Sequence, residues 1–257
     1  MSVYILAQEP DRETERRRLA MLQQYQDAPT IRCLEQTGIT AGWRCLDAGA
    51  GAGSISRWLA GRVGPRGAVL AVDLDTSLLE ESDNLGVRRH DLRTDELPEA
   101  AFDLVHARLV LTHLPEREEV LDALVQATRP GGWVVVGDID FTPVRLDRED
   151  EAFKQVAESY SVISAKAGGD PAIGPKLPEM LHAHGLDDVQ AEEFRTLVRG
   201  GTAGATALSL TFERIRERTI ELGVPDASVS WARRLLTDPA VGLYSPSIWT
   251  AWGRRPA

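Results

Sequence analysis

The alternation of apolar and polar positions divides the first half of the chain into helices and short, almost wholly apolar strands. Apolar residues spaced three and four apart predict helices over residues 12–27, 30–37, 54–59, 77–84 and 116–128. Pro29 is a natural start for the second of these helices, because its fixed φ suits a first helical turn, and Gly38 is a natural end. Continuous apolar runs predict strands over residues 43–49, 68–75, 102–111 and 133–140.

In the second half of the chain, strands and helices alternate less regularly. The pattern predicts a helix over 149–167, a loop over 168–175, a helix over 176–184 and a strand over 189–198. Two more helices follow, over residues 203–222 and 226–236, and the alternating residues 244–254 predict a last strand. We found no internal repeat.

The order of these elements predicts the fold class. Strands that are apolar throughout and separated by helices are typical of a parallel sheet covered on both faces. The alternation βαβαβ therefore predicts a doubly wound α/β fold. We expect an N-terminal helical cap segment over 1–40, a core over 41–199 and 243–257, and a helical cap insert over 200–242.

Charge and composition narrow the choice of partners. The chain has 257 residues, with 29 Lys and Arg against 39 Asp and Glu, and a formal net charge of −10 at pH 7. Nucleic-acid backbones and anionic membrane surfaces need clustered basic residues, so neither is expected as a partner. Cys33 and Cys45 are too few for a disulfide framework or a zinc site and favour a reducing compartment. No run reaches roughly 18 apolar residues, and the charged N-terminus is unlike a signal peptide, so we expect a cytoplasmic protein.

The most informative residues are 46–54, LDAGAGAGS, between a predicted strand and a predicted helix. Gly49 and Gly51 permit a tight turn and a close approach of a ligand to the backbone, in the manner of nucleotide-binding loops. Asp73 lies about 20 residues beyond Gly53 at the end of the next strand, where a carboxylate binds ribose hydroxyls. A dinucleotide site has the spacing GxGxxG. This loop is one residue shorter and begins with Asp47, whose charge would repel a pyrophosphate but suits an amino group and a sulfonium.

The loop resembles the first motif of the class I S-adenosylmethionine-dependent methyltransferases, a D/E-x-G-x-G-x-G run. Later segments resemble further motifs of that family in the same order: Asp91-Leu92, FDLVHARLVLTHLP, and RPGG followed by WVVVGD. The resemblance covers residues 43–140. It implies a Rossmann-like, seven-stranded sheet with the order 3-2-1-4-5-7-6 and an antiparallel last strand.

The resemblance also implies S-adenosylmethionine as the cofactor and assigns its contacts. From the methionine end to the adenine end, the matching positions are Asp47, Gly49, Ala50, Gly51, Ala107, Arg108, Asp73, Leu74, Asp91 and Leu92. Asp73 would bind both ribose hydroxyls, and Asp91 would accept from the adenine amino group. The N-terminal residues are similar to those of bacterial relatives whose first helices close over the cofactor. Tyr4, Arg17 and Gln24 are therefore candidates as well, unless they only join helices.

A catalytic base is harder to assign. Methyl transfer is an in-line displacement that needs a base only where the acceptor loses a proton. His113 is the best candidate, because THLP follows the fourth strand, whereas His106 lies within an apolar strand and favours a core role. Asp138 and Asp140 end the fifth strand and either orient an acceptor or cap a loop. No spacing resembles a metal-ligand set such as HExxH, so no metal is expected.

These features favour a methyltransferase of small-molecule biosynthesis that acts on a small, largely apolar acceptor at O, N or C. One alternative is a protein of the same fold that binds S-adenosylmethionine for another reaction. A second is an NAD-dependent oxidoreductase, against which the short loop and Asp47 count. The insert over 200–242 covers the acceptor pocket or, alternatively, forms a homodimer surface.

Overall fold

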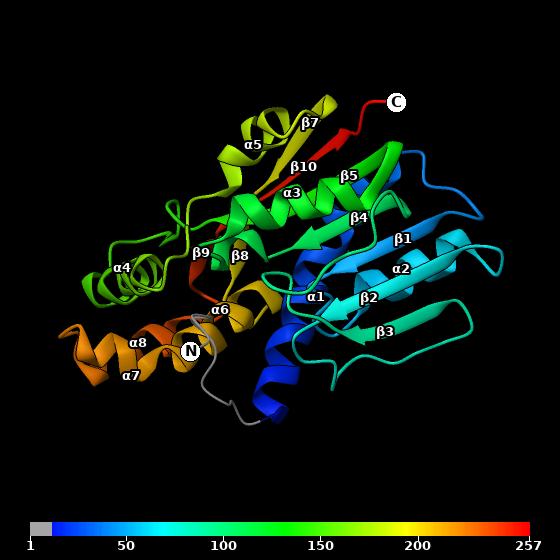
Figure 1. The fold of residues 1–257 in the computed structure, drawn as a ribbon. Helices are drawn as coiled ribbons and strands as arrows, with labels where there is room; N and C mark the ends of the chain where they lie inside the picture. The colour runs from blue at the N-terminus through cyan, green and yellow to red at the C-terminus, as the bar shows by residue number, and fades with distance from the viewer. Residues whose placement is uncertain (1–11) are drawn as a thin grey trace.

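A seven-stranded sheet organises the chain in the computed structural model, which describes residues 12–257 (Figure 1). Five strands are parallel: β1 (Arg44–Ala48), β2 (Ala68–Asp73), β3 (Leu85–Arg89), β4 (Phe102–Arg108) and β5 (Thr128–Asp140). β10 (Ser247–Arg254) runs antiparallel between β5 and β7 (Asp187–Phe194). The spatial order is β3-β2-β1-β4-β5-β10-β7, so the predicted order 3-2-1-4-5-7-6 with an antiparallel last strand is confirmed.

Helices cover both faces of this sheet, as its apolar strands require. On one face, α2 (Ser54–Val63) and the second half of α1 (Arg12–Gln36) bury Cys33, Leu34 and Leu59 against Cys45 and Leu104. On the other face lie α3 (Arg117–Ala127), α5 (Leu177–Ala183) and the short 3-10 turns η1 (Leu111–His113) and η2 (Gly174–Lys176). The core therefore has the two layers of helices that a doubly wound sheet predicts.

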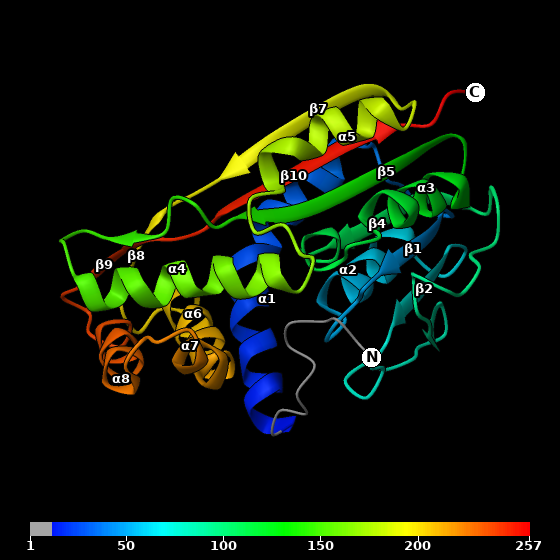
Figure 2. The same ribbon diagram turned by 60° about the vertical axis from the view of Figure 1, so that its left-hand side comes forward.

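A second apolar core lies beyond the carboxyl ends of the parallel strands (Figures 1 and 2). Its helices are α4 (Glu151–Lys166), α6 (Ala203–Arg214), α7 (Arg216–Glu221) and α8 (Asp226–Leu235). A small antiparallel sheet of β6 (Arg145–Leu146), β9 (Gly242–Tyr244) and β8 (Leu197–Arg199) joins it. Phe153 of α4 packs edge-on against Phe212 of α6, with ring centroids 5.8 Å apart. The insert over 200–242 is helical, as predicted, and packs on α4.

The N-terminal region is one helix rather than two. α1 continues through Pro29, where the sequence predicts a break. Packing outweighs the local cost of proline: Tyr25 lies against Phe194 before it, and Cys33 and Leu34 are buried after it. Within residues 12–257, neither α1 nor any other helix combines the length and the apolar character needed to cross a membrane.

Residues 77–84 form turns instead of the predicted helix. Polar side chains at the two ends of this segment bind backbone groups: one makes a local turn, which competes with helical hydrogen bonding, and the other reaches α2. Asp75 Oδ1 accepts from the Ser77 N–H at 2.9 Å, and Asn84 Nδ2 donates to the carbonyls of Ala60 and Gly64, each at 2.9 Å. The segment is thereby tied to the end of α2.

The predicted strand over 189–198 is divided between the two sheets. β7 ends at Phe194 and β8 begins at Leu197, and the facing strands β10 and β9 are likewise separated at Ser245 and Pro246. Proline has no N–H to donate to a ladder, so pairing stops there. The interruption lets the chain turn from the core sheet into the second core.

Two glycines give a matched test of this packing. Gly61 is a helical residue with nothing within 4 Å of an added Cβ, whereas a Cβ on Gly200 would collide with the backbone of Asp238. We expect Gly61→Ala to raise the free energy of unfolding by about 0.5–1 kcal/mol. Gly200→Ala should lower it by about 1–3 kcal/mol, because the second core must shift. Urea unfolding of both variants checks this, and equal effects would contradict it.

Candidate functional site

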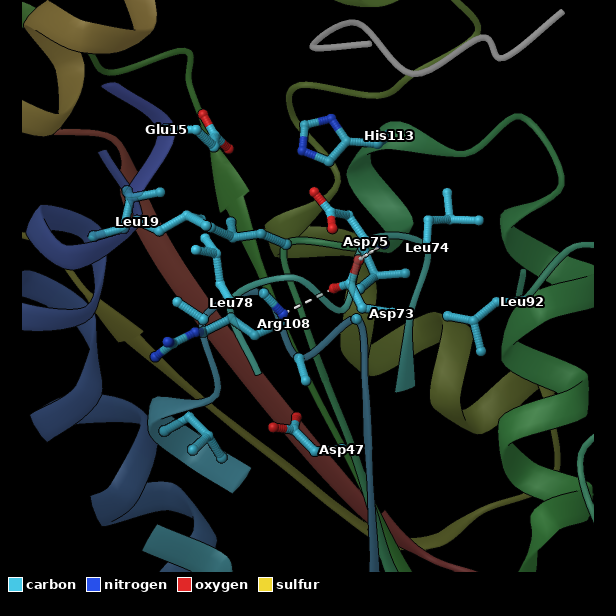
Figure 3. A pocket seen from close by; sticks show the side chains of 18 of the residues that line it. Glu15, Leu19, Asp47, Asp73, Leu74, Asp75, Leu78, Leu92, Arg108 and His113 are labelled. Carbon is cyan, nitrogen blue, oxygen red and sulfur yellow. Dashed lines mark hydrogen bonds between the residues drawn. The ribbon is translucent and has the colours of Figure 1, made fainter. Parts of the chain in front are cut away.

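A cavity of about 430 Å³ opens at the carboxyl ends of β1, β2, β3 and β4 (Figure 3). Its walls come from the glycine loop after β1, the residues that end β2 and β3, the turn after β4 and the first half of α1. Asp73, Leu74 and Leu92 face this space in Figure 3. Ligands of open α/β sheets bind at this edge.

The glycine loop is held tightly against the neighbouring strand. The N–H groups of Gly49 and Ala50 both donate to the carbonyl of Val72, at 2.8 and 3.0 Å. Gly49 has φ 73°, and a Cβ there would collide with Cγ2 of Val110. Only glycine therefore fits between the loop and the turn after β4.

Asp73 ends β2 and faces the cavity. Its carboxylate accepts from the backbone N–H of Gly51 at 2.8 Å and from that of Asp75 at 3.0 Å. Burial raises the pKa of Asp73 above its ordinary value, although both N–H groups favour the ionised form. The side chain thus joins the glycine loop to the end of β2, with Leu74 beside it.

Asp47 lies lower, under the glycine loop, and only 2% of it is exposed. Ser56 Oγ donates to one of its oxygens at 2.5 Å, and His106 Nδ1 lies 2.8 Å from the other. Burial alone would raise the pKa of Asp47. The hydrogen bonds from His106 and Ser56 and the charge of Arg108 outweigh burial and hold that pKa below its usual range. The sequence predicts a ligand contact for Asp47; the structure shows it bound to β4 and α2 at the floor of the cavity.

Of the predicted residues that follow β3 and end β4, some line the cavity and one does not. Asp91 and Leu92 line the cavity, and Asp91 is ion-paired with Arg93 at 2.6 Å. Arg108 also lines the cavity, but its guanidinium donates to Asp27 and Thr30 of α1, at 2.9 and 3.0 Å. Ala107 departs from the expectation: it is buried in the core and lines neither cavity. Successive strand residues point to opposite faces, so Ala107 cannot share the direction of Arg108.

The residues of α1 that line the cavity are not the ones that the sequence predicts. Arg17 and Gln24 are exposed, and Tyr4 lies outside the described residues. Arg18, Leu22 and Gln26 line the cavity instead, along one stripe of positions four apart. Arg18 is buried and bound to Glu15 at 2.8 Å, and Glu15 also binds Arg214 of α6. Three consecutive arginines, at 16–18, cannot be told apart by the sequence pattern, and the packing of α1 decides which of them faces the cavity.

A second, smaller cavity of about 80 Å³ adjoins the first, between α1, α4, α6 and the ends of β5 and β10. Most of its lining is aliphatic or aromatic. Phe141 and Tyr160 stack there with centroids 4.2 Å apart, and the hydroxyl groups of Tyr25 and Ser245 lie 2.6 Å apart. Residues common to both linings are Arg18, Leu22, Gln26, Leu109 and His113. The two cavities therefore meet beside His113.

His113 is buried at this junction. Burial, together with the charges of Arg18 and Arg214, lowers the pKa of His113 to about 3. Its imidazole is therefore neutral at physiological pH. His113 thus follows β4 and lines both cavities, in an environment that opposes protonation.

Comparison with known proteins gives consistent matches. The family described as "Methyltransferase domain" matches residues 46–136. A methyltransferase, str2, from Strobilurus tenacellus is 31% identical over 147 residues, which are 54% of this chain and 52% of that protein. The ubiquinone/menaquinone biosynthesis C-methyltransferase UbiE of Pseudomonas savastanoi pv. phaseolicola is 27% identical over 192 residues, 68% of this chain and 74% of that protein. This chain thus spans about half the length of str2.

The solved structures show the same fold. Phosphoethanolamine N-methyltransferase 2 of Haemonchus contortus, in complex with phosphomonomethylethanolamine and S-adenosylhomocysteine, superposes with a TM-score of 0.57 at 20% identity. The match covers 90% of this chain and 53% of that one. Residues 46–136 therefore match a methyltransferase domain, and the chain as a whole has the fold of solved S-adenosylmethionine-dependent methyltransferases.

Proposed function

We propose that this protein transfers a methyl group from S-adenosylmethionine to O, N or C of a small, largely apolar acceptor. The observation that carries the proposal is the pair of adjoining cavities. The larger has a carboxylate at the end of β2 and a glycine loop, and the smaller has an apolar, aromatic lining. They meet at one passage, where a donor and an acceptor would be brought together.

The residues of the larger cavity fit S-adenosylmethionine. Asp73 has two acceptor oxygens at the strand end where a ribose diol binds, and Leu74 and Leu92 offer apolar surface for an adenine ring. Asp91 keeps acceptor capacity beside its pairing with Arg93, because each carboxylate oxygen has two lone pairs. The backbone of Gly49, Ala50 and Gly51 lines the cavity, where it would contact the methionine part. Asp47 would act through the loop that it holds.

The bound cofactor supplies a methyl group on a sulfonium, which is already activated for displacement. The chain then has to align the acceptor and exclude water. Leu22, Leu109 and His113 form the passage, and Ile139, Phe141 and Tyr160 cover the acceptor side. With a pKa of about 3, His113 is a weak base, so we assign it a role in shaping and orienting rather than in removing a proton.

The helices of residues 200–242 act in this proposal as a cap. Gly204, Ala207, Leu208 and Thr211 of α6 line the smaller cavity. Phe212, Val229 and Leu235 are buried against the rest of the chain, which favours the cap over the alternative of a dimer surface. The first half of α1 closes the other side. Cap and core thus contribute opposite walls of one site.

We expect Asp73→Ala to weaken binding of S-adenosylmethionine by about tenfold or more, through loss of charge-assisted hydrogen bonds to the ribose. Calorimetric titration with S-adenosylmethionine, S-adenosylhomocysteine and NAD measures this. Asp83→Ala, an exposed carboxylate of the same β2–β3 connection, is the matched control. Unchanged affinity in a folded Asp73→Ala protein, or preferential binding of NAD, would overturn the cofactor assignment.

A second experiment tests the acceptor cavity. Ala207→Phe should fill it, leaving affinity for S-adenosylhomocysteine within about twofold while slowing methyl transfer about a hundredfold, because the acceptor no longer reaches its alignment. Acceptors are first found by screening phenols, amines and enolisable ketones with methyl-labelled cofactor. Thr206→Phe, half-buried on α6 outside the cavity lining, is the control. Methyl transfer by the Ala207→Phe protein at the native rate would contradict the proposal that α6 covers the acceptor cavity. If no acceptor is methylated although the cofactor binds, a different reaction in the same site is favoured.

His113 also predicts a pH dependence of stability. Its folded pKa, about 3, lies below its unfolded value of about 6.5, so the unfolded state binds the extra proton. The stability that this group contributes is complete above pH 6.5 and is lost as the pH falls toward 3. We therefore expect His113→Leu to lose less stability than the native protein between pH 7 and pH 5 in urea unfolding. An identical loss would show that His113 titrates normally.

A further inference from the structure

The turn between β4 and η1, residues 109–113, forms the passage between the two cavities. Leu109 and His113 line both cavities, and Val110 fills the space over Gly49. Leu109 has φ 56°, a left-handed conformation that is unfavourable for a residue with a branched side chain. The turn therefore needs to be held by its surroundings.

Several backbone contacts hold it at its ends. The N–H of Leu109 donates to the carbonyl of Gly137 at 2.8 Å. Thr112 Oγ1 donates to the carbonyl of Asp170 at 2.9 Å, and the Asp170 N–H donates back to the Thr112 carbonyl at 2.8 Å. Between these points, the N–H groups of the turn face the side chain of Asp138.

Asp138 lies on β5, the neighbouring strand, and is 1% exposed. Its Oδ2 accepts from the Thr112 N–H at 3.2 Å, and the N–H groups of Ile139 on its own strand and of Leu111 and Val110 on the turn also favour its ionised form. Within residues 12–257, its Oδ1 has no hydrogen-bond partner, nor has Nε1 of Trp249, the residue opposite it on β10. The donors on the turn are therefore the main compensation for its charge.

We propose that Asp138 is a positioning residue whose ionised carboxylate holds the turn 109–113 and so fixes the passage between the two cavities. Asp138 itself lines neither cavity, so it acts through Leu109, Val110 and His113. The alignment of an acceptor with a methyl group in this passage rests on the proposed function. The binding of the turn by Asp138 does not depend on that function.

The strength of the interaction between Asp138 and the turn changes with pH near neutrality. Burial raises the pKa of Asp138 to about 7, and its hydrogen bonds to the turn only partly oppose this. Protonation would weaken those bonds, since an ionised acceptor binds about twice as strongly as a neutral one. Titratable or charged groups on the neighbouring turn and loops are His113, which stays neutral, Arg117, which donates to the Leu111 carbonyl, and Asp170 paired with Lys176 at 2.6 Å. Those on the strands are bound elsewhere: His106 to Asp47, Arg108 to Asp27, and Asp140 to Thr142. The turn should therefore tighten as the pH rises through 7.

Hydrogen exchange of the amides of residues 110–112 tests the proposal. At pH 8 we expect Asp138→Asn to exchange them about tenfold faster than the native chain, the effect of losing one charge-assisted hydrogen bond. Asp140→Asn is the matched control, because Asp140 is two residues further along β5 and binds Thr142 instead of the turn. Native-like exchange in Asp138→Asn would overturn the proposal.

A pH series on the native chain decides the question even where the variant fails to fold. After correction for intrinsic exchange, protection of these amides should fall about tenfold between pH 8 and pH 6, in Asp140→Asn as well, whereas Asp138→Asn should show no such change. Amide protection that does not change with pH in the native chain would contradict the proposal that ionised Asp138 holds the turn. Titration with S-adenosylhomocysteine separates the two proposals: if the turn responds to pH but the ligand does not bind, the proposed function fails and the role of Asp138 stands.

Discussion

The site depends on the attachment of α1 across the carboxyl edge of the sheet. Arg108, at the end of β4, donates to both Asp27 and Thr30 of this helix, and Asp27 also accepts from Ser54 at the start of α2, at 3.0 Å. Each charge-assisted bond contributes about 1.5–3 kcal/mol. A slip of the helix by one residue would leave a part-buried guanidinium and carboxylate unpaired, so these bonds also fix its register. The stripe of α1 that walls both cavities follows from that register.

The first turns of the same helix set the charge at the passage. Burial alone would raise the pKa of Glu15, but its bonds to Arg18 and Arg214 outweigh burial and lower that pKa. The cluster stays ionised, and its two guanidinium groups add to burial in lowering the pKa of His113 and keeping that ring neutral. A neutral ring that fills the passage suits the proposed transfer of a methyl group, which would need alignment and the absence of water more than a proton acceptor. Helix packing and electrostatics thus lead to the same chemistry.

The sequence predicts the sheet well because apolar strands and glycine-rich turns are local signals. It finds β1, β2, β4 and the loop that contains Gly49, and it places Asp73 correctly at a strand end. It predicts poorly where distant packing decides. Continuation of α1 through Pro29 and the choice of Arg18 over Arg17 depend on contacts with β7, β10 and α6. The opposite environments of Asp47 and Asp138 are equally beyond it, because both residues simply belong to apolar strands.

Those two carboxylates show what partners do to a buried charge. Asp47 and Asp138 are each almost fully buried in the same sheet, yet their pKa values move in opposite directions. Asp47 has Ser56 and His106 as side-chain partners and Arg108 nearby, and it therefore stays ionised under the glycine loop. Among the residues that the structure describes, Asp138 has only backbone N–H groups as donors, and most of them belong to the turn, so its ionisation depends on the turn's conformation. The cofactor loop consequently rests on a fixed charge. The charge of Asp138 is coupled instead to the conformation of the turn that forms the passage. In the proposed function, the part of the site that would receive the acceptor is therefore the part free to adjust.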